Sequence, residues 1–177
     1  IARTSAAGRW KGDSDMKVGI IMGSKSDLPV MEEAAALLKQ FGIAYEMRVL
    51  SAHRCPEEVA QFSRDAVTNG FGVIIAGAGM AAHLPGVIAA STTLPVIGVP
   101  IDATSLGGLD ALLSTVQMPG GIPVATMAIG KAGARNAALM AARILALNDE
   151  ALRRKLQQHA EQMARDVEEK HRKLECL

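Results

Sequence analysis

The stretch KVGIIMGSKSDLPVMEEAAALLKQFG, residues 17–42, decides the fold class of this chain. Its first six residues form a nearly continuous apolar run, which is typical of a strand covered on both faces. A helical pattern follows, with Ser26 or Asp27 as the expected N-cap, apolar residues every three to four positions, and Gly42 at its end. A buried strand that leads into an amphipathic helix is the first half of a βαβ unit.

The same alternation continues to about residue 147. Further strands are predicted at residues 43–50, 72–77, 95–99 and 123–127. Further helices are predicted from Pro56 to Asn69 and over residues 81–90, 105–116 and 133–147, the last so rich in Ala that another element can pack closely on it. We therefore predict an α/β fold: a three-layer αβα sandwich with a flavodoxin-like, doubly wound parallel sheet of about five strands.

The length of 177 residues suits one domain, which we expect to span residues 16–177. Residues 1–15 lack apolar periodicity and begin with Ile, so we expect a tag or a disordered extension there. Residues 149–173 form a charged helical pattern with one thin apolar stripe near heptad spacing: Leu152, Leu156, Met163, Val167 and Leu174. Such a C-terminal helix (149–177) can fold back on its own domain or pack on a neighbouring subunit, and we favour a homo-oligomer.

Composition argues against several classes of function. The 19 Lys and Arg against 18 Asp and Glu provide no large positive field for polymeric nucleic acid. The apolar runs are far shorter than the roughly 20 residues of a membrane span. Cys55 and Cys176 are the only cysteines, and no His, Cys, Asp or Glu cluster has metal-ligand spacing, so we expect a reducing cytoplasm and no metal or cofactor.

In an open parallel sheet ligands bind beyond the carboxyl ends of the strands, so the loop after the first strand is a candidate site. Gly23 permits close approach, the hydroxyls of Ser24 and Ser26 and free helix amides can accept a phosphate, and Asp27 can take a ribose hydroxyl. The alternative is that Ser26 and Asp27 only cap the helix. Neither GxxxxGK[ST] nor GxGxxG is present, which disfavours a nucleoside triphosphate or NAD.

The loop after the second strand contains Ser51, Ala52, His53 and Arg54. The Arg54 guanidinium can clamp a phosphate, and an imidazole at this place can act as an acid or base. A solvated or structural histidine is the alternative for His53. The sequence therefore places a candidate catalytic histidine beside a candidate phosphate ligand.

The loop after the third strand reads GAGMAAHLPG, residues 77–86. Unhindered backbone amides in such a loop can hold a carboxylate, and His83 lies near a helix start. The alternative is that the small residues serve tight packing of backbone on backbone. The candidate binding residues of this loop are Gly77, Ala78, Gly79, Met80 and Leu84, with His83 as a second candidate catalytic residue.

The three loops together resemble the class I family of N5-carboxyaminoimidazole ribonucleotide mutases. The match covers about residues 16–149 and is carried by MGSKSD (22–27), SAHR (51–54), AGAG (76–79), AAHLPG (81–86) and QMP (117–119). The resemblance implies that Ser24, Ser26, Asp27, Ser51 and Arg54 hold the ribose phosphate and that the loop from Gly77 to His83 encloses the carboxylated imidazole. It also implies an octamer with sites at subunit boundaries, and a reaction without cofactor or metal.

In that family the carboxylate leaves the exocyclic amine as carbon dioxide, which C4 of the aminoimidazole ring then attacks. The resemblance implies that His53 is the general acid and base and that His83 orients the ligand or the gas. The related class II carboxylases lack the AAHLP run present here, which favours the mutase. Three positions depart from the family: Cys55 replaces a usual Thr, Met80 a usual Gly, and Gly120 a common Arg.

Other functions remain open at this point. A noncatalytic nucleotide-sensing relative could use the same sheet, because fold alone does not fix activity. A carboxylase acting directly on aminoimidazole ribonucleotide and carbon dioxide, or a carboxylating enzyme of another nucleotide pathway, could use the same loops. A phosphoacceptor receiver is disfavoured, because the third strand ends in Gly77 and Ala78 where a receiver needs an Asp.

Overall fold

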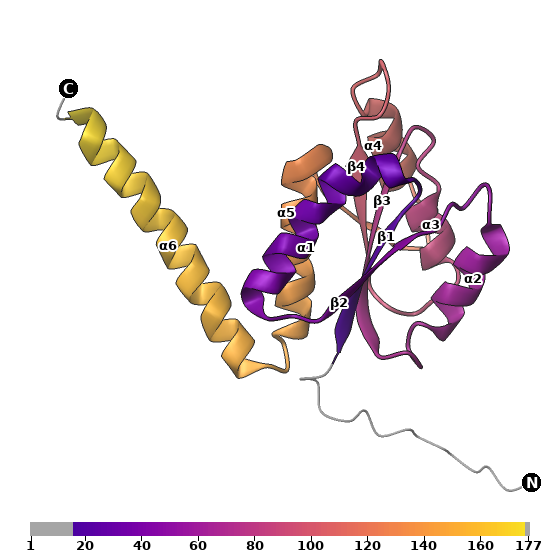
Figure 1. Ribbon diagram of the computed structural model, residues 1–177, viewed down its shortest axis with the longest axis horizontal. Helices are drawn as coiled ribbons and strands as arrows, with labels where there is room; N and C mark the ends of the chain where they lie inside the picture. The colour runs from indigo at the N-terminus through magenta and orange to yellow at the C-terminus, as the bar shows by residue number, and fades with distance from the viewer. Residues whose placement is uncertain (1–15, 176–177) are drawn as a thin grey trace, which may run out of the picture.

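Five strands form one parallel sheet in the computed structural model, which describes residues 16–175 (Figure 1). They are β1 (Lys17–Met22), β2 (Tyr45–Val49), β3 (Phe71–Gly79), β4 (Val96–Ile101) and β5 (Ala125–Thr126). Their order in the sheet is β2-β1-β3-β4-β5, which is the flavodoxin-like order and confirms the predicted fold class. The strand order reverses between β1 and β3, since β2 lies beside β1 on one side and β4 lies beside β3 on the other, so ligands are expected at the carboxyl ends of these two strands.

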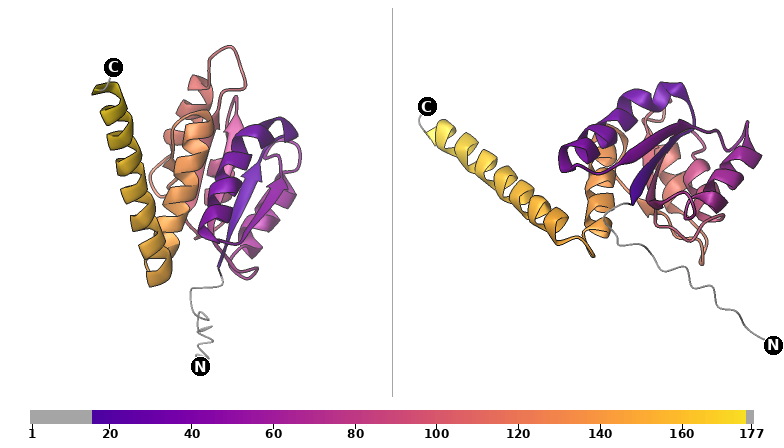
Figure 2. Two further views of the ribbon diagram at one scale, coloured as in Figure 1. Left: turned by 60° about the vertical axis from the view of Figure 1, so that its left-hand side comes forward. Right: turned by 60° about the horizontal axis from the view of Figure 1, so that its bottom comes forward.

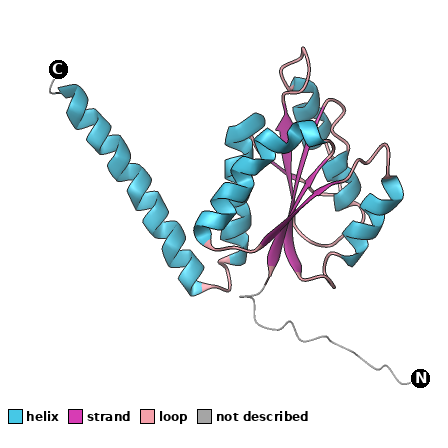
Figure 3. Cartoon of the chain, in the orientation of Figure 1, coloured by secondary structure: helices cyan, strands magenta, loops and turns pink. Residues whose placement is uncertain are grey.

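Helices cover both faces of the sheet (Figure 3). They are α1 (Leu28–Phe41), α2 (Pro56–Asp65), α3 (Leu84–Ala89), α4 (Leu109–Val116), α5 (Gly130–Leu145) and α6 (Glu150–Glu175), with a single 3-10 turn, η2 (Lys25–Asp27). One apolar core joins the sheet to α1 and α5, and a second joins the other face to α2, α3 and α4. Both faces of the sheet are therefore buried, as the continuous apolar runs predicted.

Two predicted strands are shorter in the structure. The prediction of β2 from residue 43 was wrong because the Ile43 amide donates to the Leu38 carbonyl and belongs to the end of α1. The prediction of β5 over residues 123–127 was also too long, since only Ala125 and Thr126 pair with β4. Pro123 has no N–H to donate to a neighbouring strand, which explains the late start of β5.

Three helices begin at other residues than predicted. The helix predicted from residue 105 begins as α4 at Leu109, because Gly107 and Gly108 have φ of 59° and 83° and break helical geometry. The helix predicted from residue 81 begins as α3 at Leu84 and ends at Ala89. The Ala-rich helix predicted from residue 133 begins one turn earlier, at Gly130. The first two corrections add loop residues at the carboxyl edge of the sheet.

The start of α1 also differs from the simple cap that the sequence suggested. Asp27 is the N-cap, but its side chain does not cap α1. The Asp27 carboxylate instead accepts a hydrogen bond from the Ser24 amide at 2.9 Å, and the Ser24 hydroxyl accepts one from the Ser26 amide. Ser24 and Asp27 thus form a capping box around η2, one turn before α1.

Only the first turns of α6 pack on the domain. Leu152 is buried, the Lys155 ammonium donates to the Phe41 carbonyl at 3.0 Å, and the His159 ring meets Phe41 edge-on. The far end of α6 stands away from the sheet in Figure 1 and in the right view of Figure 2. The apolar side chains there are exposed: Met163 by 47%, Val167 by 66% and Leu174 by 68%.

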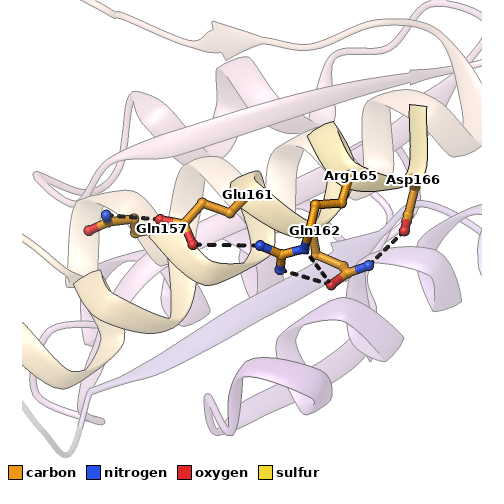
Figure 4. A network of polar contacts seen from close by, with 5 residues as sticks. All are labelled: Gln157, Glu161, Gln162, Arg165 and Asp166. Atoms are coloured by element: carbon orange, nitrogen blue, oxygen red, sulfur yellow. Dashed lines mark hydrogen bonds and ion pairs between the residues drawn. The ribbon is translucent and has the colours of Figure 1, made fainter. Parts of the chain in front are cut away.

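Other sides of α6 carry a chain of polar contacts along the helix (Figure 4). It consists of Gln157, Glu161, Gln162, Arg165 and Asp166, joined by four hydrogen bonds and one ion pair. Such contacts between residues three or four apart support a helix that little else covers. Within residues 16–175 no helix has the length and apolar character to span a membrane. The prediction for residues 1–15 lies outside the described residues.

Candidate active site

A cavity of about 580 Å³ opens at the carboxyl ends of β1 to β4. Its lining brings together the three candidate loops: Gly23, Ser24, Ser26, Asp27, Ser51, Ala52, His53, Arg54, Ala78, Gly79, Met80, Ala81, His83, Leu84 and Ala103. Gly77 is the one predicted site residue outside this lining. A Cβ on Gly77 would overlap the Met31 side chain, so this glycine permits α1 to pack on β3.

Two lining residues were absent from the sequence-based site. Ala81 lies within the predicted third loop, between Met80 and His83. Ala103 follows β4, and a Cβ on Gly79 would lie 2.6 Å from the Ala103 Cβ. The rule that ligands bind beyond every strand of such a sheet could have found Ala103, since β4 is the next strand after β3.

The two candidate catalytic histidines are in direct contact. His53 Nε2 and His83 Nδ1 are 2.7 Å apart, and the rings meet edge to face with centroids 4.9 Å apart. One nitrogen of this contact must donate and the other must accept, so only one of the two carries a proton. A proton that His53 gives or takes at Nε2 therefore changes the hydrogen bond to His83.

Arg54 reaches back across the cavity mouth to the first loop. Its guanidinium donates to the Gly23 carbonyl at 3.2 Å and its Nε donates to the Ser51 hydroxyl at 3.4 Å. The Ser24 and Ser26 hydroxyls lie in that same first loop, 2.9 Å from each other. A guanidinium beside three hydroxyls is a suitable arrangement for binding a phosphate.

The backbone amides of the first loop are less available than the sequence suggested. The amides of Ser24 and Ser26 already donate within the loop, to Asp27 and to the Ser24 hydroxyl. Burial raises the pKa of the Asp27 carboxyl, while hydrogen bonds from the Ser24 and Gly23 amides oppose that rise. These two amides are therefore not free to meet an anion, whereas the serine hydroxyls and Arg54 line the same cavity, and Asp27 supports the loop from within.

Cys55 holds the second loop together. The Ser51 amide donates to its Sγ at 3.1 Å, the thiol donates to the Ser51 carbonyl, and its own amide donates to the same carbonyl at 2.9 Å. These contacts close the turn that presents His53 and Arg54 just before α2. The thiol is thus a structural group in a half-buried position.

The third loop contains an unusual backbone conformation. Met80 has φ of 58°, and no other non-glycine residue within 16–175 has a positive φ. This turn separates the end of β3 from His83, which precedes α3. Across the described range, no group of three or more His, Cys, Asp or Glu residues is placed to hold a metal ion.

Comparison with known proteins identifies the family of this chain. The model of the family described as AIR carboxylase matches residues 17–166. An N5-carboxyaminoimidazole ribonucleotide mutase of Pyrococcus horikoshii is 58% identical over 89% of this chain and 88% of that protein. The mutase of the same name from Thermotoga maritima is 54% identical over 91% of this chain and 93% of that protein.

The fold has a close counterpart among solved structures. The crystal structure of Treponema denticola PurE matches with a TM-score of 0.81 and 33% identity. The match covers 89% of this chain and 97% of the Treponema chain.

Proposed function

Because this chain belongs to the AIR carboxylase family, we propose that its cavity converts N5-carboxyaminoimidazole ribonucleotide to 4-carboxyaminoimidazole ribonucleotide. The reaction is a mutase step of purine biosynthesis. The observation that carries its assignment to this cavity is the His53–His83 pair beside the cluster of hydroxyls and Arg54. An acid-base group next to a phosphate site matches a phosphorylated substrate that must exchange two protons.

The ribose phosphate is bound by the first two loops. Ser24, Ser26 and Ser51 donate hydroxyl hydrogen bonds to the phosphate oxygens, and the Arg54 guanidinium supplies the opposite charge. Asp27 takes a ribose hydroxyl or holds the loop for it. This end of the substrate does not react, so its binding energy serves to position the imidazole ring.

His53 moves both protons of the reaction. It first gives a proton to the exocyclic nitrogen as the bond from that nitrogen to the carboxyl carbon breaks and carbon dioxide departs. C4 of the ring then attacks the carbon dioxide, and His53, now deprotonated, removes the hydrogen from C4. One proton leaves His53 and one returns, so the enzyme regains its starting state, while His83 stabilises each state through the 2.7 Å contact.

The third loop encloses the ring and the gas. Ala78, Gly79 and Ala103 are small, so they leave room at the cavity wall for the imidazole carboxylate. Carbon dioxide held beside C4 has a high effective concentration and reacts before it diffuses away. The mutase therefore requires no supply of bicarbonate, in contrast to a carboxylase that takes up free carbon dioxide.

The active assembly is a homo-oligomer, and the octamer is the form that the family resemblance implies. The exposed stripe on α6 supports this proposal, because three large apolar side chains there have no cover in the chain itself. A cytoplasmic location is proposed because Cys55 is a free thiol, as expected in a reducing compartment. Sedimentation and cell fractionation test these two points.

The decisive experiment follows conversion of N5-carboxyaminoimidazole ribonucleotide to its C4-carboxylated isomer by absorbance, with and without added bicarbonate. Turnover that does not depend on bicarbonate is expected for the mutase. Turnover only from the uncarboxylated nucleotide plus bicarbonate would show a carboxylase instead. Binding of the nucleotide without any turnover would support the nucleotide-sensing alternative.

A further inference from the structure

The QMP motif, residues 117–119, follows α4 and packs on a helix that borders the cavity. Gln117 is the C-cap of α4, and its amide donates to the Leu113 carbonyl at 3.2 Å. The next residue, Met118, extends over α3: a Cβ added at Gly86 would lie 3.1 Å from both Sδ and Cε of Met118. The end of the Met118 side chain thus stands where residue 86 would otherwise carry a side chain of its own.

Met118 contacts α3 on the side that does not face the sheet. The buried residues of α3 are Leu84, Pro85 and Ile88. At about 100° of rotation per residue these three share one side of the helix, while Gly86 lies on the opposite side. The helix has only six residues, so few contacts can hold it in place. The sheet and α2 pack on its buried side, and Met118 packs on the other.

The position of α3 determines where His83 lies. His83 is the N-cap of α3, with φ of −75° and ψ of −20°, and its carbonyl accepts a hydrogen bond from the Val87 amide at 3.0 Å. His53 precedes α2, which packs on α3. The 2.7 Å contact between the two imidazoles therefore depends on how these two helices lie against each other. A small displacement of α3 is enough to weaken this contact, because a good hydrogen bond needs a heavy-atom distance below about 3.2 Å and a favourable angle.

We propose that Met118 is a positioning residue that holds His83 within hydrogen-bonding distance of His53 by fixing α3. This inference rests on the proposed function, in which His83 stabilises both protonation states of His53. Met118 is not part of the cavity lining of this chain, so it acts on the reaction through the helix. The groups proposed to bind the phosphate belong to the first two loops, so the role of Met118 concerns the rate of proton transfer and not the affinity for the ribonucleotide.

The first test compares the steady-state kinetics of three full-length variants at a temperature where each is folded. Met118→Ala removes the atoms that lie over Gly86, and we expect kcat to fall on the order of tenfold while KM stays within about twofold of the parent value. Met118→Leu keeps an apolar side chain of similar volume and should keep kcat. Met140→Ala makes the same change on α5, which covers the other face of the sheet, and should leave kcat unchanged.

A double-mutant cycle tests whether Met118 acts through His83. His83→Asn alone should lower kcat, because His53 then loses its imidazole partner. Adding Met118→Ala to His83→Asn should lower kcat no further, since the group that Met118 positions is already gone. A merely structural role of Met118 predicts the same fold loss of kcat with and without His83.

Gly86→Ala tests whether the effect of Met118 passes through α3. Gly86 has no positive φ, so alanine suits the backbone there. In the parent the new Cβ meets Met118 and pushes the two apart, so kcat should fall. In Met118→Ala the same Cβ occupies part of the vacated space, so the double variant should have a kcat several-fold above that of Met118→Ala alone.

Parent-level kcat in Met118→Ala would overturn the positioning role, and so would an equal fold loss in the His83→Asn background. A double variant with Gly86→Ala that is no faster than Met118→Ala would also overturn it, because the path through α3 would be wrong. A parent enzyme that does not convert the ribonucleotide would instead refute the proposed function, so the two failures are distinguishable.

Discussion

At the scale of single residues, the His53–His83 contact is the feature with the most chemical content. The 2.7 Å separation allows one proton between Nε2 of His53 and Nδ1 of His83. The hydrogen bond couples the tautomers of the two rings, because the ring whose contacting nitrogen carries the proton obliges the other ring to accept. His83 thereby acts on the reaction through His53 as well as through the ligand.

We predict that His53→Asn lowers kcat by about 10²- to 10⁴-fold, the usual contribution of a general acid and base. The KM for the ribonucleotide should change little, because the phosphate site in the first two loops stays intact. Steady-state kinetics together with calorimetric titration of the ribonucleotide measure the two effects. Turnover near the parent rate would remove His53 from its assigned role.

Arg54→Ala serves as the matched comparison from the same loop. The Arg54 guanidinium donates to the Gly23 carbonyl of the first loop and does not contact His53. We therefore expect KM to rise on the order of tenfold or more, with a smaller effect on kcat. If kcat fell as strongly in Arg54→Ala as in His53→Asn, the separation of binding from proton transfer between these neighbours would be wrong.

Asp27 leads to a prediction on stability against pH. Burial raises the pKa of its carboxyl in the folded protein. Between the ordinary Asp range and the raised value the folded state binds more protons than the unfolded state, so this group makes the free energy of unfolding fall as pH rises. Asp27→Asn should remove that slope, which urea unfolding at a series of acidic pH values measures.

Glu33 should have the opposite effect to Asp27 on how the free energy of unfolding changes with pH. Its hydrogen bond from Arg135, at 2.9 Å, lowers the pKa of the Glu33 carboxyl. Glu33 therefore contributes to the free energy of unfolding at pH values above the ordinary pKa of Glu. This contribution is lost as the pH falls through the lowered pKa of Glu33. Glu33→Gln should remove the rise in the free energy of unfolding with pH that Glu33 contributes. Equal slopes of the free energy of unfolding against pH in Asp27→Asn and Glu33→Gln would contradict the role of Asp27 burial.

At the scale of elements, the close packing of α1 on α5 positions the first loop at the carboxyl edge of the sheet. The buried face of α5 consists largely of alanine, as in Ala134, Ala137 and Ala141, so α1 packs closely against it. This confirms the packing expected from the Ala-rich sequence. α1 in turn begins directly after the first loop, so the packing of these two helices positions Ser24, Ser26 and Asp27.

We predict that Gly133→Ala destabilises the protein by about 1–3 kcal/mol, the usual result of overpacking. A Cβ on Gly133 would overlap the Ala128 carbonyl, which belongs to backbone and cannot move away easily. Gly120→Ala is the matched control, since a Cβ there meets nothing within 4 Å. Urea unfolding midpoints compare the two, and an equal change in both variants would refute the packing explanation.

At the scale of the whole molecule, α6 is divided between two roles. Its first turns belong to the domain through Leu152 and Lys155, while its far half presents Met163, Val167 and Leu174 to solvent. The first half therefore folds back on its own domain, which is one of the two possibilities that the sequence left open, and packing of the second half on a neighbouring subunit stays a prediction. The right view of Figure 2 shows the second half standing away from the sheet.

We predict that Val167→Glu lowers the oligomeric mass measured by light scattering, because a charge in a buried apolar interface has no partner. The residue is 66% exposed in the isolated chain, so folding of the domain should not suffer. Gln158→Glu, at another exposed position of α6, is the control and should leave the mass unchanged. Removing the chain from Asp149 onward should have the same effect, and an unchanged mass would refute a role for α6 in assembly.

Much of this molecule was determined by the sequence alone. The apolar runs predicted all five strands, and the alternation of strands and helices predicted the parallel, doubly wound sheet that the structure shows. The loops predicted after the first three strands contain every predicted site residue that lines the cavity, although Ala78 and Gly79 end β3 and Leu84 begins α3 in the structure. These features depend on short-range patterns, because hydrophobic periodicity and turn residues act within a few positions of the chain.

The tertiary structure alone decided which groups meet. His53 and His83 lie 30 residues apart in sequence and Arg54 and Gly23 lie 31 apart, so no local pattern could predict their contacts. Sheet order also brought Ala103 to the site, and it let Gly77 face Met31 instead of the cavity. The left-handed turn at Met80 has the same origin, since strain at one residue persists only where the surrounding fold holds it in place.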